Sequence, residues 1–110
     1  MFFNIPEVGP QEAKRMLEEE GDKVLLLDVR TPPEHAQIRI PNSILIPLDE
    51  LRYAFQSLPK DKKIIVYCRS GERSAFATYF LRQMGYEAYN LAGGILIWPY
   101  ETESGIPPKY

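Results

Sequence analysis

Five short apolar runs, separated by segments with helical spacing, restrict the folds open to this chain. The runs occupy residues 2–5, 24–27, 44–46, 63–67 and 88–91. Between them, apolar residues recur three and four positions apart, which is the spacing of a helix that buries one face. Strands that alternate with helices favour an α/β fold with a mainly parallel sheet. The continuous apolar character of residues 24–27 fits a strand buried on both of its faces.

Cap and turn residues indicate where several helices begin and end. Thr31 is predicted to be the N-cap of a short helix, with Pro32 at the first position and Glu34 closing a capping box. Gly93 and Gly94 predict a tight turn before another short helix. A helix after residue 74 is predicted to have an apolar face made of Ala75, Phe76, Tyr79, Phe80 and Met84.

The composition excludes several classes of function. A chain of 110 residues is enough for one domain, residues 1–110, with its own core. The net charge of −2 at pH 7 gives no bulk attraction to nucleic acid or to an anionic membrane, so neither is expected as a partner. No apolar run approaches the ~18 residues of a membrane span, and the first residues lack the features of a signal peptide. We therefore expect a cytoplasmic location, and the sequence offers no cluster of metal ligands.

Cys68 is the only cysteine, and it directly follows the apolar run 63–67. It cannot form an internal disulfide, which fits a reducing compartment. Before the next helical segment come Arg69, Ser70, Gly71, Glu72, Arg73 and Ser74. Unpaired N–H groups at the start of a helix favour an anion such as a thiolate. Such surroundings can lower a thiol pKa from about 8.5 into the range ~3.5–7.5, so Cys68 is a candidate nucleophile.

The residues that follow Cys68 suggest separate roles. Gly71 is expected to supply a positive φ within the loop. Ser70 and Ser74 could each donate a hydrogen bond to the sulfur or cap the helix, and capping is the preferred role for Ser74. Glu72 is expected to point outward, because a negative charge beside the sulfur would oppose anion binding. The competing interpretation is that Cys68 is a buried structural cysteine, as free cysteines often are.

Three segments carry a family resemblance. Residues 26–32 read LLDVRTP, residues 68–75 read CRSGERSA, and residues 91–95 read LAGGI with Trp98 shortly after. In this order and spacing they resemble the rhodanese (sulfurtransferase) family, and residues 40–47 add weaker agreement, as does the Gly-Ile-Pro sequence near the end. The resemblance implies a single rhodanese-like domain, with a five-stranded, mainly parallel sheet flanked by helices.

The resemblance also implies a sulfurtransferase whose catalytic cysteine is Cys68. This cysteine would take a sulfane sulfur from a small donor such as thiosulfate, hold it as a persulfide and pass it to an acceptor. Small thiols, cyanide and sulfur-relay proteins are the candidate acceptors. No cofactor is expected beyond the covalent persulfide itself.

Charged residues near the predicted site are assigned from their positions. Cys68 and the Asp28-Val29-Arg30 segment are both predicted at the carboxyl ends of parallel strands, where α/β sheets bind ligands. Arg69 is the candidate for contacting an anionic donor. The resemblance implies that Arg73 braces the loop, and Asp28 is its predicted partner. Arg30 either joins this network or is exposed.

Several positions depart from the family pattern. Ile38 and Arg39 stand where members often have Gly-His, and Asn42 and Ser43 stand where Gly-Ala is often seen. These departures bear on the local turn and on donor choice more than on the chemistry. His35, the only histidine, is predicted to be a solvated helix residue rather than a catalytic base.

Two other functions compete with sulfur transfer. Cysteine phosphatases place five residues between cysteine and arginine, whereas four residues separate Cys68 from Arg73. Arsenate reduction through an internal disulfide would need a second cysteine. The other competitor is a non-catalytic rhodanese-like interaction module, although such modules often lack the cysteine that this chain keeps.

Overall fold

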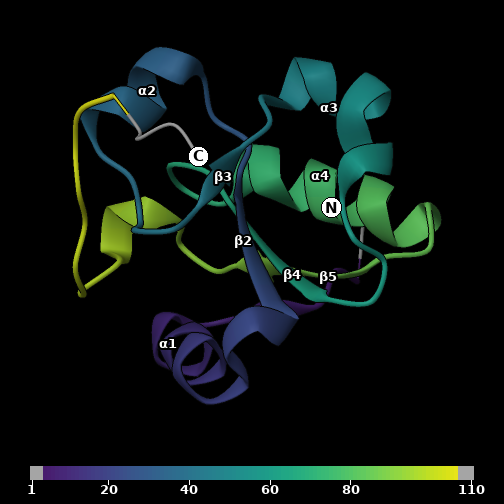
Figure 1. Ribbon diagram of the computed structural model, residues 1–110, viewed down its shortest axis with the longest axis horizontal. Helices are drawn as coiled ribbons and strands as arrows, with labels where there is room; N and C mark the ends of the chain where they lie inside the picture. Colours follow the sequence, from purple (N-terminus) through teal and green to yellow (C-terminus); the bar gives the residue numbers. More distant parts are fainter. Residues whose placement is uncertain (1–3, 107–110) are drawn as a thin grey trace.

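The computed structural model describes residues 4–106, which form a five-stranded sheet with helices on both faces (Figure 1). The strands are β1 (Glu7–Val8), β2 (Val24–Asp28), β3 (Ile44–Leu45), β4 (Lys63–Tyr67) and β5 (Glu87–Leu91). Their order across the sheet is β1-β5-β4-β2-β3, and every neighbouring pair is parallel. The predicted α/β fold with a parallel sheet is confirmed.

The first strand lies later in the chain than predicted. Residues 2 and 3 of the predicted run lie outside the described residues, and residues 4 and 5 are not in a strand. The Pro6 carbonyl accepts a hydrogen bond from the Asn90 N–H at 2.9 Å. Proline has no N–H to donate to a strand partner, so the regular pairing of β1 with β5 begins only after Pro6.

Helices cover the two faces of the sheet unequally. In Figure 1, α1 (Pro10–Glu20) lies against one face, and α3 (Leu48–Ala54) and α4 (Glu72–Gln83) lie over the opposite face. The short helix α2 (Pro32–Gln37) follows the carboxyl end of β2. Within residues 4–106, no helix combines the length and apolar character needed to cross a membrane.

Short 3-10 helices and caps complete the connections. The 3-10 helices are η1 (Gly21–Lys23), η2 (Phe55–Ser57) and η3 (Ile95–Ile97). The predicted capping box of α2 is confirmed: the Thr31 N–H donates to Glu34 Oε1 at 3.0 Å, and the Glu34 N–H donates to Thr31 Oγ1 at 3.4 Å.

Alternate residues of β4 fill two separate cores. Ile64 and Val66 belong to the core beneath α3 and α4, whereas Ile65 and Tyr67 belong to the core on the α1 side. Successive side chains of a strand point to opposite faces of the sheet. Cys68 points to the same face as Ile64 and Val66 and packs within the core beneath α4. The strand pattern therefore places the thiol under the first turn of that helix.

The buried face of α4 differs from the apolar face that the sequence predicted. Its fully buried residues are Ser74, Ala77, Thr78 and Leu81, whereas the side chains of Phe76, Tyr79 and Met84 are among the exposed large hydrophobics. Small residues let this helix approach β4 and β5 closely, and the buried hydroxyls are satisfied by nearby hydrogen bonds. One example is Thr78 Oγ1, which donates to the Ser74 carbonyl at 2.7 Å. Hydrophobic spacing alone could not reveal this preference.

Candidate active site

Cys68 lies at the carboxyl end of β4 with only 1% of its surface exposed. Its sulfur accepts hydrogen bonds from the Gly71 N–H at 3.1 Å, the Ser74 N–H at 3.4 Å and the Ser74 hydroxyl at 3.3 Å. Gly71 has the predicted positive φ, 110°, and this conformation turns its N–H back toward the sulfur. The loop and the first turn of α4 thus form a small anion site around the thiol.

The surroundings of Cys68 act on its pKa in opposite directions. Burial raises the pKa of the thiol, because a thiolate loses solvation inside the protein. Hydrogen bonds from the Ser74 hydroxyl, and then from the N–H groups of Ser74, Gly71 and Ser70, lower it. The net result is a lowered pKa, so the site favours the nucleophilic thiolate.

A glycine turn after β5 holds the beginning of the loop. The Ile95 N–H donates to the Cys68 carbonyl at 2.9 Å, and the Leu96 N–H donates to the Arg69 carbonyl at 3.0 Å. A Cβ atom on Gly94 would lie 2.3 Å from the Arg69 carbonyl oxygen, and the φ of Gly94 is 64°. The close approach of this turn to the cysteine loop therefore requires glycine at position 94.

Ser74 does not cap α4, so the preferred role predicted for it is wrong. Gly71 is the N-cap residue, and no side chain caps this helix. The Ser74 hydroxyl instead lies 2.6 Å from Asn90 Oδ1 and 3.3 Å from the Cys68 sulfur. A hydroxyl carries one hydrogen, so it can donate fully to only one of these two acceptors at a time.

Asn90 is a site residue that the sequence reasoning missed. Its Nδ2 group donates to Glu7 Oε2 and to the Gly71 carbonyl, each at 3.1 Å. Both partners only accept hydrogen bonds, which fixes the amide so that Oδ1 faces Ser74. A polar residue in the otherwise mostly apolar β5 is the signal that could have revealed it, since asparagine is unfavourable in strands.

Arg73 pairs with Glu34, so the prediction that Asp28 is its partner is wrong. The guanidinium donates to both carboxylate oxygens of Glu34, at 2.8 and 3.0 Å. The same carboxylate accepts the capping-box bonds of Thr31, so one side chain links α2 to the first turn of α4. The hydrogen-bonded Arg73 guanidinium lowers the pKa of Glu34 to about 2, against the opposing effect of burial.

Asp28 forms a different buried network beneath α2. Its carboxylate accepts from the Arg30 backbone N–H at 2.9 Å and from the Arg30 guanidinium at 2.8 Å. His35 Nδ1 lies 2.8 Å from the same carboxylate. Of the two alternatives for Arg30, the structure favours a network, because only 3% of its surface is exposed. The prediction that His35 is solvated is wrong, because His35 is 4% exposed and packs against Asp28.

The remaining loop residues face outward. Arg69, Ser70 and Glu72 are all exposed, as expected for Glu72. Among the described residues, no hydrogen bond or ion pair engages the Arg69 guanidinium, whereas Arg73 and Arg30 both have acidic partners. The loop therefore presents one uncompensated cation to a ligand.

Two cavities border the loop. Arg69 lines one of about 440 Å³, Arg73 lines one of about 340 Å³, and Arg30 lines both. Apolar side chains of Ile38 and Leu96 complete part of the larger cavity. Within residues 4–106, no group of three or more His, Cys, Asp or Glu residues is arranged to hold a metal ion.

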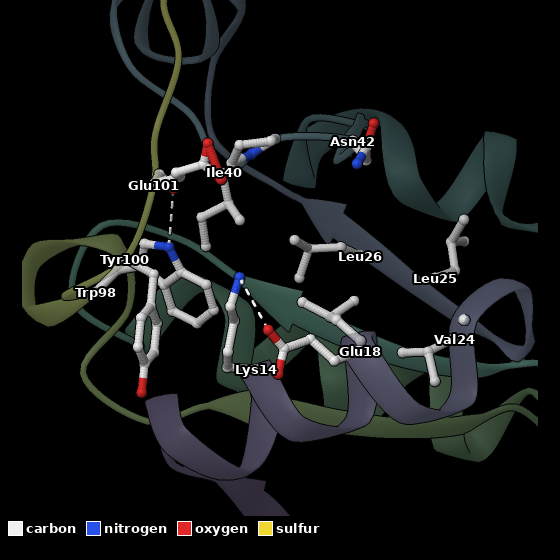
Figure 2. A pocket seen from close by; sticks show the side chains of 13 residues that line it. Lys14, Glu18, Val24, Leu25, Leu26, Ile40, Asn42, Trp98, Tyr100 and Glu101 are labelled. Carbon is white, nitrogen blue, oxygen red and sulfur yellow. Dashed lines mark hydrogen bonds and ion pairs between the residues drawn. The ribbon is translucent and has the colours of Figure 1, made fainter.

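A third cavity, of about 410 Å³, lies on the α1 side of the sheet (Figure 2). Lys14 and Glu18 form an ion pair at 3.7 Å on one wall, and Trp98 Nε1 donates to the Glu101 carbonyl at 3.1 Å on another. None of the described residues that line this cavity belongs to the loop at 68–74. We therefore assign it no part in the site around Cys68.

Comparison with known proteins identifies the family. The family model described as Rhodanese-like domain matches residues 9–99. The chain belongs to the rhodanese family. A sulfurtransferase of Allochromatium vinosum is 39% identical, with 94% of each chain covered. The putative sulfurtransferase YtwF of Bacillus subtilis is 31% identical, with 92% of this chain and 97% of YtwF covered.

A solved structure supports the same assignment. The rhodanese-related protein of Thermoplasma volcanium is 35% identical and has a TM-score of 0.82. The alignment covers 89% of this chain and 97% of that chain. Together, the relatives support an enzyme of the rhodanese family that transfers sulfur.

One departure from the rhodanese pattern ties the segment around residues 103–105 to α2. Arg39, 3% exposed, donates to the carbonyls of His35 at 3.1 Å and Gly105 at 2.6 Å. Its Nε also donates to Glu103 Oε2 at 3.0 Å. An arginine at this position therefore holds the segment around residues 103–105 against the helix that carries Glu34.

A second departure preserves a backbone conformation. Asn42 has a φ of 67°, in the region that glycine adopts freely and asparagine tolerates better than most residues. This explains why asparagine can replace the glycine of many rhodaneses. The neighbouring Ser43 hydroxyl lies 3.0 Å from the Tyr67 hydroxyl, so it adds a hydrogen bond that alanine could not make.

Proposed function

We propose that this protein is a sulfurtransferase that carries sulfane sulfur as a persulfide on Cys68. The observation that carries the proposal is the set of three neutral donors from Gly71 and Ser74 around a buried sulfur. They stabilise a thiolate without neutralising its charge, so the sulfur remains able to attack.

With thiosulfate as donor, the Cys68 thiolate attacks the outer sulfur. A new S–S bond forms, the S–S bond of thiosulfate breaks, and sulfite leaves with the bonding electron pair. Cyanide or a thiolate then attacks the outer sulfur of the persulfide, and the Cys68 thiolate leaves with the electron pair. Cyanide becomes thiocyanate, and a thiolate becomes a persulfide. Each step exchanges one anion for another, so we propose that the reaction needs no cofactor.

The charged residues have distinct proposed roles. Arg69, exposed and without an acidic partner among the described residues, would attract the anionic donor. Arg73 would hold the loop in place through its ion pair with Glu34 of α2. The buried pair of Asp28 and Arg30 would in turn support α2. An Arg73 engaged by a carboxylate is poorly placed to bind phosphate, which disfavours the phosphatase alternative.

Intact mass measurement tests this function. The reduced protein should gain one sulfur atom on exposure to thiosulfate, and cyanide should remove that atom with release of thiocyanate. The Cys68→Ser variant should gain nothing. If the wild type gains no sulfur from thiosulfate or from a persulfide donor, the non-catalytic interaction module becomes the better interpretation. Because the proposed chemistry needs a free thiol, we also propose a reducing compartment, the cytoplasm, as its location.

A further inference from the structure

The cavity beside Arg69 has an apolar rim that a small anion would not use. Ile38, in the segment after α2, is 43% exposed, and Leu96, in η3, is 60% exposed. Both side chains line the same cavity of about 440 Å³, together with Ile95. Large apolar side chains that gather beside the cysteine loop indicate a ligand with apolar surface of its own.

The charges of this cavity are compensated except at one place. Arg30 is paired with Asp28, and Glu34 is paired with Arg73. Arg69 is the remaining charged residue of the lining, and no described carboxylate pairs with it. The cavity thus combines apolar contacts with one available positive charge. A complementary ligand combines apolar groups with one negative charge.

Thiosulfate and cyanide match only the charge of this surface. Neither has an apolar group to place against Ile38 or Leu96. Cys68 does not itself line this cavity, so a ligand that contacts Ile38 and Leu96 must extend beyond the cavity for its nucleophile to reach the sulfur. A peptide segment has this extent and can offer apolar side chains on either side of a cysteine.

We propose that Ile38, Leu96 and Arg69 form a docking surface for a protein acceptor of sulfur. The segment that docks presents a cysteine flanked by apolar residues, with an acidic side chain within reach of Arg69. This inference rests on the proposed sulfur transfer and names the class of its acceptor. Ile38 is also one of the positions at which this chain departs from the pattern of its family.

Binding of synthetic peptides tests the surface independently of sulfur chemistry. One fluorescent decapeptide has a central serine in place of cysteine, flanked by leucines, with one glutamate. A matched peptide has serines in place of the leucines, and a third has glutamine in place of the glutamate. We expect the first peptide to bind about tenfold more tightly than either of the others, as measured by fluorescence anisotropy.

Variants of the protein locate the binding. Ile38→Ser and Leu96→Ser should each abolish most of the preference for the leucine peptide. Arg69→Ala should abolish the preference for glutamate over glutamine. Tyr53→Ser is the matched control, because Tyr53 is an exposed apolar residue on α3, with 72% of its surface accessible, and does not line this cavity. Equal affinity for all three peptides, or equal losses in Tyr53→Ser, would overturn the docking surface.

Transfer of sulfur separates this inference from the proposed function. The persulfide form of the protein is mixed with the cysteine versions of the leucine and serine peptides, and sulfur uptake by each is followed by mass. Faster transfer to the leucine peptide, lost in Leu96→Ser, supports a protein acceptor. Equal transfer to both overturns the docking surface but leaves the sulfurtransferase standing. If the protein never takes up sulfur, the proposed function fails, and the binding measurements still decide the surface.

Discussion

Two buried acidic groups lie at the carboxyl ends of neighbouring strands, and their surroundings differ. Asp28 ends β2, and Cys68 follows β4, which pairs with β2. The Asp28 carboxylate is held by the cationic Arg30 guanidinium and the His35 ring. Within the described part of the chain, the Cys68 sulfur accepts only from neutral groups of the loop and of the first turn of α4.

The difference separates a structural anion from the sulfur that we propose to be reactive. A buried carboxylate paired with arginine is a structural element, since loss of either partner leaves an uncompensated charge in the protein. Neutral donors stabilise a thiolate but do not require it, so the same loop can hold a thiol, a thiolate or the inner sulfur of a persulfide. Asp28, at the end of β2, therefore has a structural role. The surroundings of Cys68, at the end of β4, allow the charge of the sulfur to change.

Replacement of the reactive group should produce the largest functional effect. We expect Cys68→Ser to abolish sulfur transfer completely, while the unfolding midpoint in urea stays close to that of the wild type. Serine fits the space of cysteine and can accept from the same donors. Thiocyanate release from thiosulfate and cyanide measures the activity. Residual transfer above the uncatalysed rate would show that another group carries the sulfur.

Replacement of the structural anion should have the opposite result. Asp28→Asn leaves the buried Arg30 charge without its partner, which should lower the free energy of unfolding by about 3–5 kcal/mol. Urea unfolding measures this change. Asp61→Asn is the control, because Asp61 is exposed in a turn and should change stability little. A loss of less than about 1 kcal/mol for Asp28→Asn would show that Arg30 is not strongly compensated by Asp28.

Removal of the uncompensated cation should affect the donor step selectively. Arg69→Ala should lower kcat/KM for thiosulfate about tenfold, because a charge-assisted contact with the donor is lost. The value of kcat/KM for a neutral persulfide donor should fall less. Arg52→Ala, which removes an exposed arginine from α3, serves as the control. If both donors lose activity equally in Arg69→Ala, the arginine does not recognise donor charge.

The sequence was informative where the cause of a structure is local. The strand before Cys68, the positive φ of Gly71 and the capping box of Thr31 and Glu34 each depend on residues a few positions apart. These features follow from apolar runs, glycine conformations and side-chain caps, and all were predicted.

The partners within the site could not be predicted in the same way, because they depend on how distant elements meet. Asp28 was a reasonable partner for Arg73, since both were expected at the same edge of the sheet. α2 brings Glu34 to Arg73 across 39 positions of sequence, and Arg30 takes Asp28 instead. Asn90 was missed because its role depends on the position of β5 beside β4.

A smaller effect should follow from the loss of one donor to the sulfur. Ser74→Ala removes a hydrogen bond that favours the thiolate, so the pKa of Cys68 should rise. The rate of alkylation by iodoacetamide as a function of pH measures this pKa. Ser70→Ala is the matched control, because it keeps the backbone N–H that faces the sulfur. An unchanged pKa in Ser74→Ala would mean that the hydroxyl serves Asn90 alone.

The smallest effect should come from the partly exposed ion pair between Glu34 in α2 and Arg73 in α4. The pKa of Glu34 is about 2 in the folded protein, below the ~4.3 of an unfolded glutamate. Its contribution to stability is therefore present above about pH 4.3 and is lost as the pH falls toward 2. Because solvent screens the pair, the contribution should be about 0.5–1 kcal/mol.

Comparison of the wild type with Glu34→Gln tests this pH dependence. The difference in the free energy of urea unfolding should be largest near pH 6 and should shrink at pH 4 and again at pH 3. At these pH values the unfolded wild type binds a proton at Glu34, whereas the folded protein, with its Glu34 pKa of about 2, does not. Glu101→Gln, at an exposed position outside any helix, should show no comparable trend. A difference that stays constant from pH 6 to pH 3 would indicate that glutamine is unfavourable for reasons of shape, such as loss of the capping box, and that the charge of the pair with Arg73 contributes little.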